Sequence, residues 1–136
     1  MEQDLRLIPV GQVRSPFRST AEAPRQGRES GSEAVIEVNP EFREGLKGIE
    51  RWEHLLVICW LHQADRETLK VHPRGDAAST KAGVFATRSP ARPNPVAVYT
   101  VELLEVRPDS LLVRGIDALD GTPVVDLRPH IPRLDD

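Results

Sequence analysis

Residues Gly83 to Val98 read Gly-Val-Phe-Ala-Thr-Arg-Ser-Pro-Ala-Arg-Pro-Asn-Pro-Val-Ala-Val and divide this part of the chain into strand, loop and strand. Val84–Ala86 is a short apolar run that predicts a strand, and a second apolar run begins at Val96. Between them, three prolines fix the backbone φ angle and remove three amide donors, so the loop cannot join a sheet. Each proline also restricts the residue before it to extended conformations, and we therefore expect a stiff loop.

Two arginines, Arg88 and Arg92, lie four residues apart on this loop. A guanidinium group presents a rigid fork of donors that matches carboxylate and phosphate oxygens. A stiff loop that carries two such groups is typical of an anion or nucleotide site. The alternative is a proline-rich corner of a barrel with solvated arginines, and it explains the same residues equally well.

Composition limits the possible functions. The 136 residues suit a single domain with one ordinary core. The net charge is −3, from 18 basic and 21 acidic residues, so broad electrostatic binding of nucleic acid is not expected. Basic surface is local instead, because residues 77–101 contain no acidic residue while both loop arginines lie there.

The single cysteine, Cys59, lies inside the apolar run Leu55–Leu61. This position predicts a buried, reduced thiol and gives no sign of disulfides or secretion. The run is far too short to span a bilayer, and the N-terminal residues lack the apolar core of a signal peptide. We therefore expect a cytoplasmic protein with no membrane contact.

Short apolar runs separated by turn residues predict a chain built mostly from strands. One short helix is expected after Asn39, which would cap it, with Pro40 at its first position. Turns are predicted at Arg107–Ser110 and at Asp120–Gly121. Because the connections are too short for βαβ crossovers, we predict a single-sheet antiparallel β-barrel with one short helix. The expected strands are Leu7–Arg14, Ala34–Val38, His54–His62, Val84–Ala86, Val96–Val106, Leu111–Ile116 and Val124–Leu127.

Other enzyme classes find weaker support. His54 and His62 would share one face of an unbroken strand, but no close pair such as His-x-x-x-His exists, and we expect no metal site. A hydrolase with Ser89 as nucleophile lacks the Gly-x-Ser-x-Gly elbow. A Rossmann methyltransferase is disfavoured because no glycine-rich turn joins a strand to a long helix.

Three aspartates near the C-terminal end need an explanation. Asp120 suits the first position of an Asp-Gly turn. Asp117 ends a predicted strand and Asp126 interrupts another, so each must be exposed, paired or functional. A carboxylate there could accept hydrogen bonds from ribose hydroxyls. For Asp126, pairing with Arg88 or Arg128 is an equally good interpretation.

Several separated motifs resemble the TrmO/TsaA-like family, and their order along nearly the whole chain makes the resemblance specific. They are Ile8–Phe17, Ala23–Gln26, Leu46–Glu50, His54-Leu55, Leu61–Gln63, Gly83–Pro95 and Asp120–Pro132. This family comprises S-adenosylmethionine-dependent methyltransferases that act on N6-threonylcarbamoyladenosine beside the anticodon of tRNA. The resemblance implies that residues 1–136 form one domain of the TrmO N-terminal type, with no C-terminal domain.

The resemblance also implies a homodimer that binds S-adenosylmethionine near the subunit interface and takes tRNA as its substrate. The cofactor contacts would be Pro24, Arg25, Gln26, His62, Gln63, Arg88, Val98, Gly115, Ile116, Asp117 and Ala118. Arg92 and Asn94 would contact the substrate, and the base for the N6 proton would be Asp126, Asp120 or His130.

This chain differs from the usual family pattern in two motifs. Ala97 replaces a glycine and Tyr99 a serine after the proline loop, and His130 replaces the tyrosine of the usual Lys-Pro-Tyr ending. Two alternative functions stay open beside the tRNA methyltransferase. One is a non-catalytic module that binds S-adenosylmethionine or another nucleotide, and the other is a small-molecule methyltransferase on the same barrel.

Overall fold

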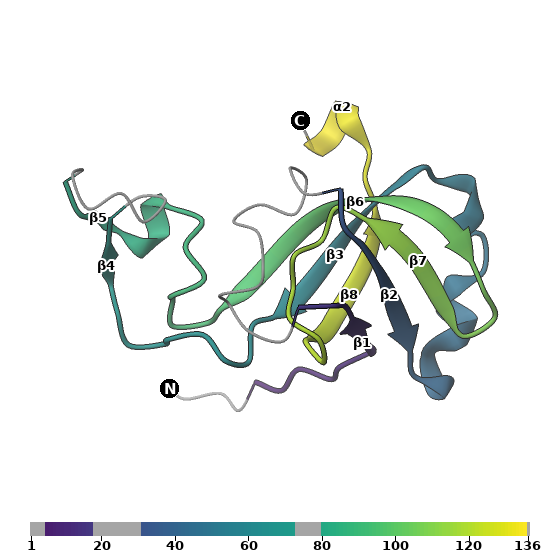
Figure 1. Cartoon of the computed structure of the whole chain (residues 1–136), viewed down its shortest axis with the longest axis horizontal. Helices are drawn as coiled ribbons and strands as arrows, with labels where there is room; N and C mark the ends of the chain where they lie inside the picture. Colours follow the sequence, from purple (N-terminus) through teal and green to yellow (C-terminus); the bar gives the residue numbers. More distant parts are fainter. Residues whose placement is uncertain (1–4, 18–30, 73–79, 136) are drawn as a thin grey trace.

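Six strands within the described residues close into an antiparallel barrel (Figure 1). The computed structural model describes residues 5–17, 31–72 and 80–135. Around the barrel the order is β1-β2-β7-β6-β3-β8, and every neighbouring pair is antiparallel. The predicted fold class, a mainly β protein with a single-sheet barrel, is therefore confirmed. The strands are β1 (Gly11–Arg14), β2 (Glu33–Val38), β3 (His54–Trp60), β6 (Val96–Val106), β7 (Ser110–Arg114) and β8 (Pro123–Pro129).

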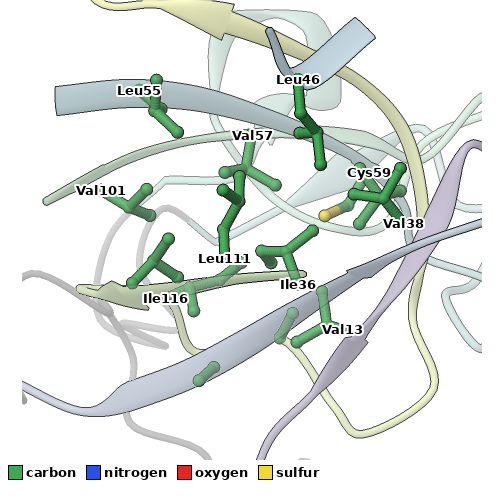
Figure 2. Packing of buried hydrophobic residues seen from close by; sticks show 14 residues of the cluster. Val13, Ile36, Val38, Leu46, Leu55, Val57, Cys59, Val101, Leu111 and Ile116 are labelled. Carbon is green, nitrogen blue, oxygen red and sulfur yellow. The ribbon is translucent and has the colours of Figure 1, made fainter. Parts of the chain in front are cut away.

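Alternation along the strands separates the core from the outer face of the barrel. On β3, Leu55, Val57 and Cys59 are fully buried, while the residues between them are partly exposed on the outer face. Branched side chains from the other strands meet them inside the barrel, as Figure 2 shows for Ile36 and Leu111. Burying each such side chain stabilises the fold by about 1.5–3 kcal/mol. The inner face of the closed sheet thus forms the hydrophobic core by itself, without a layer of helices.

The predicted turns are confirmed at both places. At the β6–β7 hairpin, the Arg107 amide donates to the Ser110 carbonyl over 2.9 Å. At the second turn, Gly121 has φ of 83°, a left-handed conformation that explains why glycine follows Asp120.

The helices differ in part from the prediction. The helix expected at Pro40 is present as η1 (Pro40–Leu46), but it is a 3-10 helix, and Asn39 does not cap it. The Asn39 side-chain amide instead donates to the Pro9 carbonyl over 3.0 Å. The described residues also form η2 (Ile49–Arg51), η4 (Val84–Ala86) and α2 (Pro132–Asp135). The prediction of one short helix therefore missed these short helical segments.

Three predicted strands differ from the structure. The first begins at Gly11 and not at Leu7. Val84–Ala86 is the 3-10 turn η4, because the amide and hydroxyl of Thr87 both donate to the Val84 carbonyl, over 3.1 and 3.0 Å, and close the turn. β3 ends at Trp60, so the prediction that His54 and His62 share one face of an unbroken strand was wrong. Beyond Trp60, the Leu61 amide donates to the Pro95 carbonyl, and the chain leaves the barrel.

The segment between β3 and β6 extends away from the barrel, to the left in Figure 1. We call its described residues, 61–72 and 80–95, the arm. It contains the two-stranded sheet formed by β4 (Lys70–Val71) and β5 (Ala82–Gly83), followed by η4 and the proline loop. Within the described part of the chain, no helix has the length and apolar character needed to span a membrane.

Candidate functional site

The arm brings two of the predicted site motifs together. The turn that carries His62 and Gln63 lies against the proline loop, because the Arg92 amide donates to the Asp65 carbonyl over 3.0 Å. The bond of the Leu61 amide to the Pro95 carbonyl, 2.8 Å long, fixes the other end of the loop. His62, Gln63 and the loop residues therefore belong to one local unit.

Hydrogen bonds within the proline loop give it a defined shape. The Ser89 amide donates to the Thr87 hydroxyl and the Ala91 amide to the Ser89 hydroxyl, each over 3.1 Å. The Nη1 atom of Arg92 donates to the carbonyls of Thr87 and Ser89, over 3.0 and 2.9 Å. Arg92, expected to contact substrate, therefore holds the loop together with this part of its guanidinium group.

Arg88 is placed differently from Arg92. Its side chain is exposed, and among the described residues it has no hydrogen bond or ion pair. A guanidinium group on an ordered loop and without a protein partner keeps all its donors for a ligand. Arg88 is thus the loop arginine best placed to bind an anionic group.

A row of side chains crosses the outer face of the barrel. Ile58 of β3 lies opposite Val98 of β6 and opposite Asp126 of β8, and the three side chains share that face. Val98 is 55% exposed. Adjacent strands lie about 4.8 Å apart, so roughly 10 Å separates the backbones at Val98 and Asp126.

The carboxylate of Asp126 has its partners within β8. It accepts a hydrogen bond from the Leu127 amide and pairs with Nε of Arg128, each over 2.9 Å. Of the two pairings considered from the sequence, the structure has the one with Arg128.

The residues after β7 fold over one end of the barrel. Gly115 has φ of 104°, which allows the chain to turn inward there. Ile116 and Ala118 are buried among the core residues, so their side chains cannot reach a ligand on the surface. Asp117 and the backbone of this stretch are the groups that a cofactor could contact.

Asp117 lies near Tyr99, a residue that the sequence motifs did not assign to the site. Burial raises the pKa of its carboxyl group above the ordinary value, while a hydrogen bond from the Tyr99 hydroxyl opposes the rise. Burial, followed by the nearby Asp117 charge, also raises the pKa of Tyr99. The replacement of a small family residue by Tyr99 was the sequence signal of this contact, but it did not identify the partner.

Cys59 lies beside this pair inside the barrel. Burial, and secondarily the Asp117 charge, raises the pKa of its thiol to about 12. The thiol is therefore protonated at neutral pH and is not a nucleophile.

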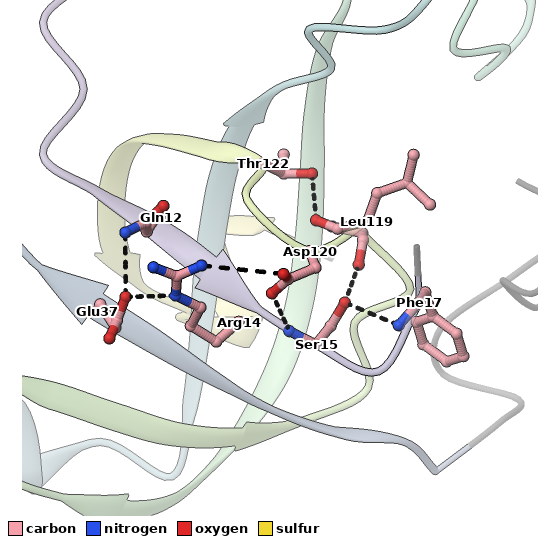
Figure 3. A network of polar contacts seen from close by, with 9 residues as sticks. Gln12, Arg14, Ser15, Phe17, Glu37, Leu119, Asp120 and Thr122 are labelled. Atoms are coloured by element: carbon pink, nitrogen blue, oxygen red, sulfur yellow. Dashed lines mark hydrogen bonds and ion pairs between the residues drawn. The ribbon is translucent and has the colours of Figure 1, made fainter. Parts of the chain in front are cut away.

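Asp120 belongs to a polar network that fastens β1 to the turn before β8 (Figure 3). Its Oδ1 accepts a hydrogen bond from the Ser15 amide over 3.1 Å, and Oδ2 lies 3.9 Å from Nη1 of Arg14. The Ser15 hydroxyl donates to the Ala118 carbonyl over 2.7 Å. These contacts give Asp120 a structural role in the predicted Asp-Gly turn.

His130 and Gly115, one of the predicted cofactor contacts, both line a hollow of about 490 Å³. The His130 and His54 rings meet edge to face with centroids 6.4 Å apart. In the same hollow, Glu102 accepts from Arg114 over 3.0 Å. His130 thus has surroundings different from those of Asp120 and Asp126.

Three predicted cofactor contacts, Pro24, Arg25 and Gln26, lie outside the described residues. Within the residues that are described, no group of three or more His, Cys, Asp and Glu side chains is arranged to hold a metal ion.

Comparison with known proteins identifies relatives along nearly the whole chain. Residues 12–136 match the family described as tRNA-methyltransferase O N-terminal domain. A probable S-adenosyl-L-methionine-binding protein of Methanothermobacter thermautotrophicus is 48% identical over 134 residues, which are 98% of this chain and 96% of that protein. An S-adenosyl-L-methionine-binding protein of Archaeoglobus fulgidus is 45% identical over 95% of this chain and 91% of its own length.

Solved structures show the same fold. The crystal structure of TrmO from Pseudomonas aeruginosa superposes with a TM-score of 0.81 and 32% identity over 98% of this chain. The chain spans 59% of the length of that TrmO structure. The family match, the archaeal relatives and the shared barrel lead to one conclusion: the chain belongs to the tRNA-methyltransferase O N-terminal domain family and has its methyltransferase fold.

Proposed function

We propose that this protein binds S-adenosylmethionine and transfers its methyl group to N6 of threonylcarbamoyladenosine beside the anticodon of tRNA, in the cytoplasm. The observation that carries the proposal is Arg88, an exposed guanidinium group with no partner among the described residues, on a loop fixed by its own hydrogen bonds. Family membership supports the reaction, and the names of two archaeal relatives support the cofactor.

The groups around the arm and the barrel end fit the parts of S-adenosylmethionine. Arg88 can bind the carboxylate of the methionine moiety through two parallel hydrogen bonds. Asp117 and the backbone beside it can accept from ribose hydroxyls. Val98 offers an exposed apolar surface to the adenine, and His62 and Gln63 add polar groups from the adjoining turn. When bound, the cofactor supplies a methyl group on a positively charged sulfur atom.

The protein's task is then to orient the acceptor base and to remove its N6 proton. Among the three candidate bases, Asp126 shares the outer face of the barrel with Val98. Asp120 is engaged in the turn, and His130 lies against the His54 ring in the hollow that Gly115 also lines. We therefore assign proton removal to Asp126 first, with Arg128 orienting its carboxylate. Arg92 and Asn94 are the proposed substrate contacts on the loop.

We also propose that two copies of the chain form a homodimer through the outer face of β3 and β6. Trp60 lies there opposite Val96, and Val96 is 41% exposed. A contiguous apolar patch on a sheet face is typical of a surface covered by a partner. Light scattering after gel filtration should give twice the chain mass, and Val96→Lys should reduce it to one chain.

The decisive experiment measures transfer of a radiolabelled methyl group from S-adenosylmethionine to bulk tRNA. We expect incorporation into tRNA that contains threonylcarbamoyladenosine and none into tRNA transcribed without modifications. Asp126→Ala should abolish transfer and leave cofactor binding nearly unchanged, because the carboxylate acts on the acceptor. If Asp126→Ala also loses binding, the residue belongs to the pocket or the fold.

The same assay separates the two alternatives. Cofactor binding without transfer to tRNA or metabolites would favour a non-catalytic binding module, and transfer to metabolites alone would favour a small-molecule methyltransferase. A chain that does not bind S-adenosylmethionine would contradict the proposal altogether.

A further inference from the structure

Arg66 connects the end of β3 to the proline loop. Its Nε donates to the Pro93 carbonyl over 2.7 Å, and its Nη2 lies 3.5 Å from the Asn94 side-chain oxygen. The guanidinium carbon lies 5.1 Å from the ring centroid of Trp60, the last residue of β3. One side chain thus contacts the barrel and the loop together, and no sequence motif singled it out.

The turn that carries Arg66 is itself fixed. The Asp65 carboxylate accepts from the amides of Glu67 and Thr68, over 2.8 and 3.2 Å, and from the Thr68 hydroxyl. The Asp65 carbonyl accepts from the Arg92 amide. Such Asx-type bonds hold a short turn in one conformation. Arg66 therefore binds the proline loop from a turn that is itself ordered.

Arg92 and Arg66 bind different parts of the proline loop. Arg92 donates to the carbonyls of Thr87 and Ser89 at the beginning of the loop, while Arg66 donates to Pro93 near its end. Arg88 lies between Thr87 and Ser89, the two residues that Arg92 binds, and its side chain has no partner among the described residues. Its position is therefore determined by the loop backbone that the other two arginines hold.

We propose that Arg66 is a positioning residue that keeps the proline loop in the conformation in which Arg88 binds the methionine carboxylate of S-adenosylmethionine. This inference rests on the proposed function. A loop that is already ordered loses less conformational entropy when the ligand binds. If the competent conformation becomes a minor population, the apparent affinity falls by the same fraction.

The first test is the affinity for S-adenosylmethionine measured by calorimetry. Arg66→Ala should raise Kd about tenfold, as expected if about a tenth of the molecules keep the competent loop. Arg66→Lys should give an intermediate Kd, because lysine keeps a cation near Trp60 and one donor but lacks the planar fork. The matched control is Arg107→Ala, which removes an exposed arginine paired with Glu105 at the β6–β7 hairpin and should leave Kd unchanged.

The second test is the double variant Arg66→Ala/Arg88→Ala. Because Arg66 acts through Arg88, its removal should add little to the loss already caused by Arg88→Ala. Two effects that multiply fully would overturn the inference, since they would show that Arg66 contributes without Arg88.

The third test needs no ligand. In Arg66→Ala, hydrogen exchange should become faster at the amides of Arg92 and Val96, which donate to Asp65 and Asn94, while the melting temperature stays unchanged. Faster exchange with an unchanged Kd, or a weaker Kd with unchanged exchange, would overturn the inference. A wild-type chain that binds no cofactor would overturn the proposed function and this role with it. Faster exchange in the variant would then still show that Arg66 orders the loop.

Discussion

The barrel and the arm are held together by different forces. In the barrel, side chains such as Ile36 and Leu111 are fully buried and pack across the closed sheet. Of the arm residues that the structure describes, Val84 and Pro95 are buried, and the rest of the order comes from prolines and arginine hydrogen bonds. The barrel therefore supplies most of the folding stability. The arm contributes less to stability, and its role is to present polar groups in a fixed arrangement to a ligand.

The largest expected effect lies in the barrel core. Ile36→Ala should lower the free energy of unfolding by about 2–5 kcal/mol, because it leaves a cavity among side chains that cannot fully collapse. Phe85→Ala in the arm removes a larger side chain that is 79% exposed, and it should change the same free energy by less than about 0.5 kcal/mol. Urea denaturation of both variants measures the contrast, and similar losses would contradict the division between barrel and arm.

The next effect concerns binding. Arg88→Ala should weaken S-adenosylmethionine binding by about 1.5–3 kcal/mol, roughly 10- to 100-fold in Kd, because a charged hydrogen-bond donor is lost. Its urea midpoint should stay that of the wild type, since the side chain has no partner among the described residues. Calorimetric titration measures the loss, and an unchanged affinity would remove Arg88 from the site.

A smaller effect depends on pH and concerns Asp117, which lies near Tyr99 and Cys59 of the barrel. Burial raises the folded pKa of Asp117, so the folded chain keeps this proton at pH values where the unfolded chain has lost it. The Asp117 contribution to stability therefore falls as pH rises from the ordinary carboxyl value towards the raised one. Asp117→Asn removes this pH-dependent contribution, and the asparagine side chain can still accept a hydrogen bond from the Tyr99 hydroxyl.

Urea titrations at several pH values measure this contribution. The stability difference between Asp117→Asn and wild type should shift in favour of the variant as pH rises above about 4. A difference that stays constant with pH would contradict the burial of the carboxyl group.

The last prediction involves no substitution and concerns the reactivity of the Cys59 thiol, which is buried in the barrel. With its pKa raised to about 12, the thiol should react with Ellman's reagent far more slowly in the native protein than in urea at the same pH. Rapid labelling of the native protein would show that the barrel opens at β3.

The barrel could be predicted because its signals are local. β6 spans Val96–Val106, the predicted range, since a long β-branched run follows the last proline and ends at a turn. The Asp120–Gly121 turn needs a left-handed residue, and glycine supplies it. Short connections explain only the β6–β7 hairpin, because the sheet closes through strands far apart in the sequence, such as β1 with β8.

The arm and the site could not be predicted in the same way. Val84–Ala86 has the apolar residues of a strand, and only the hydroxyl and amide of Thr87 make it a turn. The two-residue strands β4 and β5 are too short to show a period. Contacts such as Tyr99 with Asp117, or Arg66 with Pro93, join residues far apart in the sequence, so no spacing rule reveals them.

The arm and the residues Gly115 to Ala118 form the proposed binding site for S-adenosylmethionine. The most direct measurement is a titration of the isotopically labelled protein with the cofactor, followed by amide chemical shifts. We expect the largest shifts in the proline loop, at His62 and Gln63, and from Gly115 to Ala118, with little change at the β6–β7 hairpin. Largest shifts at that hairpin and at η1, or no shifts at saturating cofactor, would contradict this proposal.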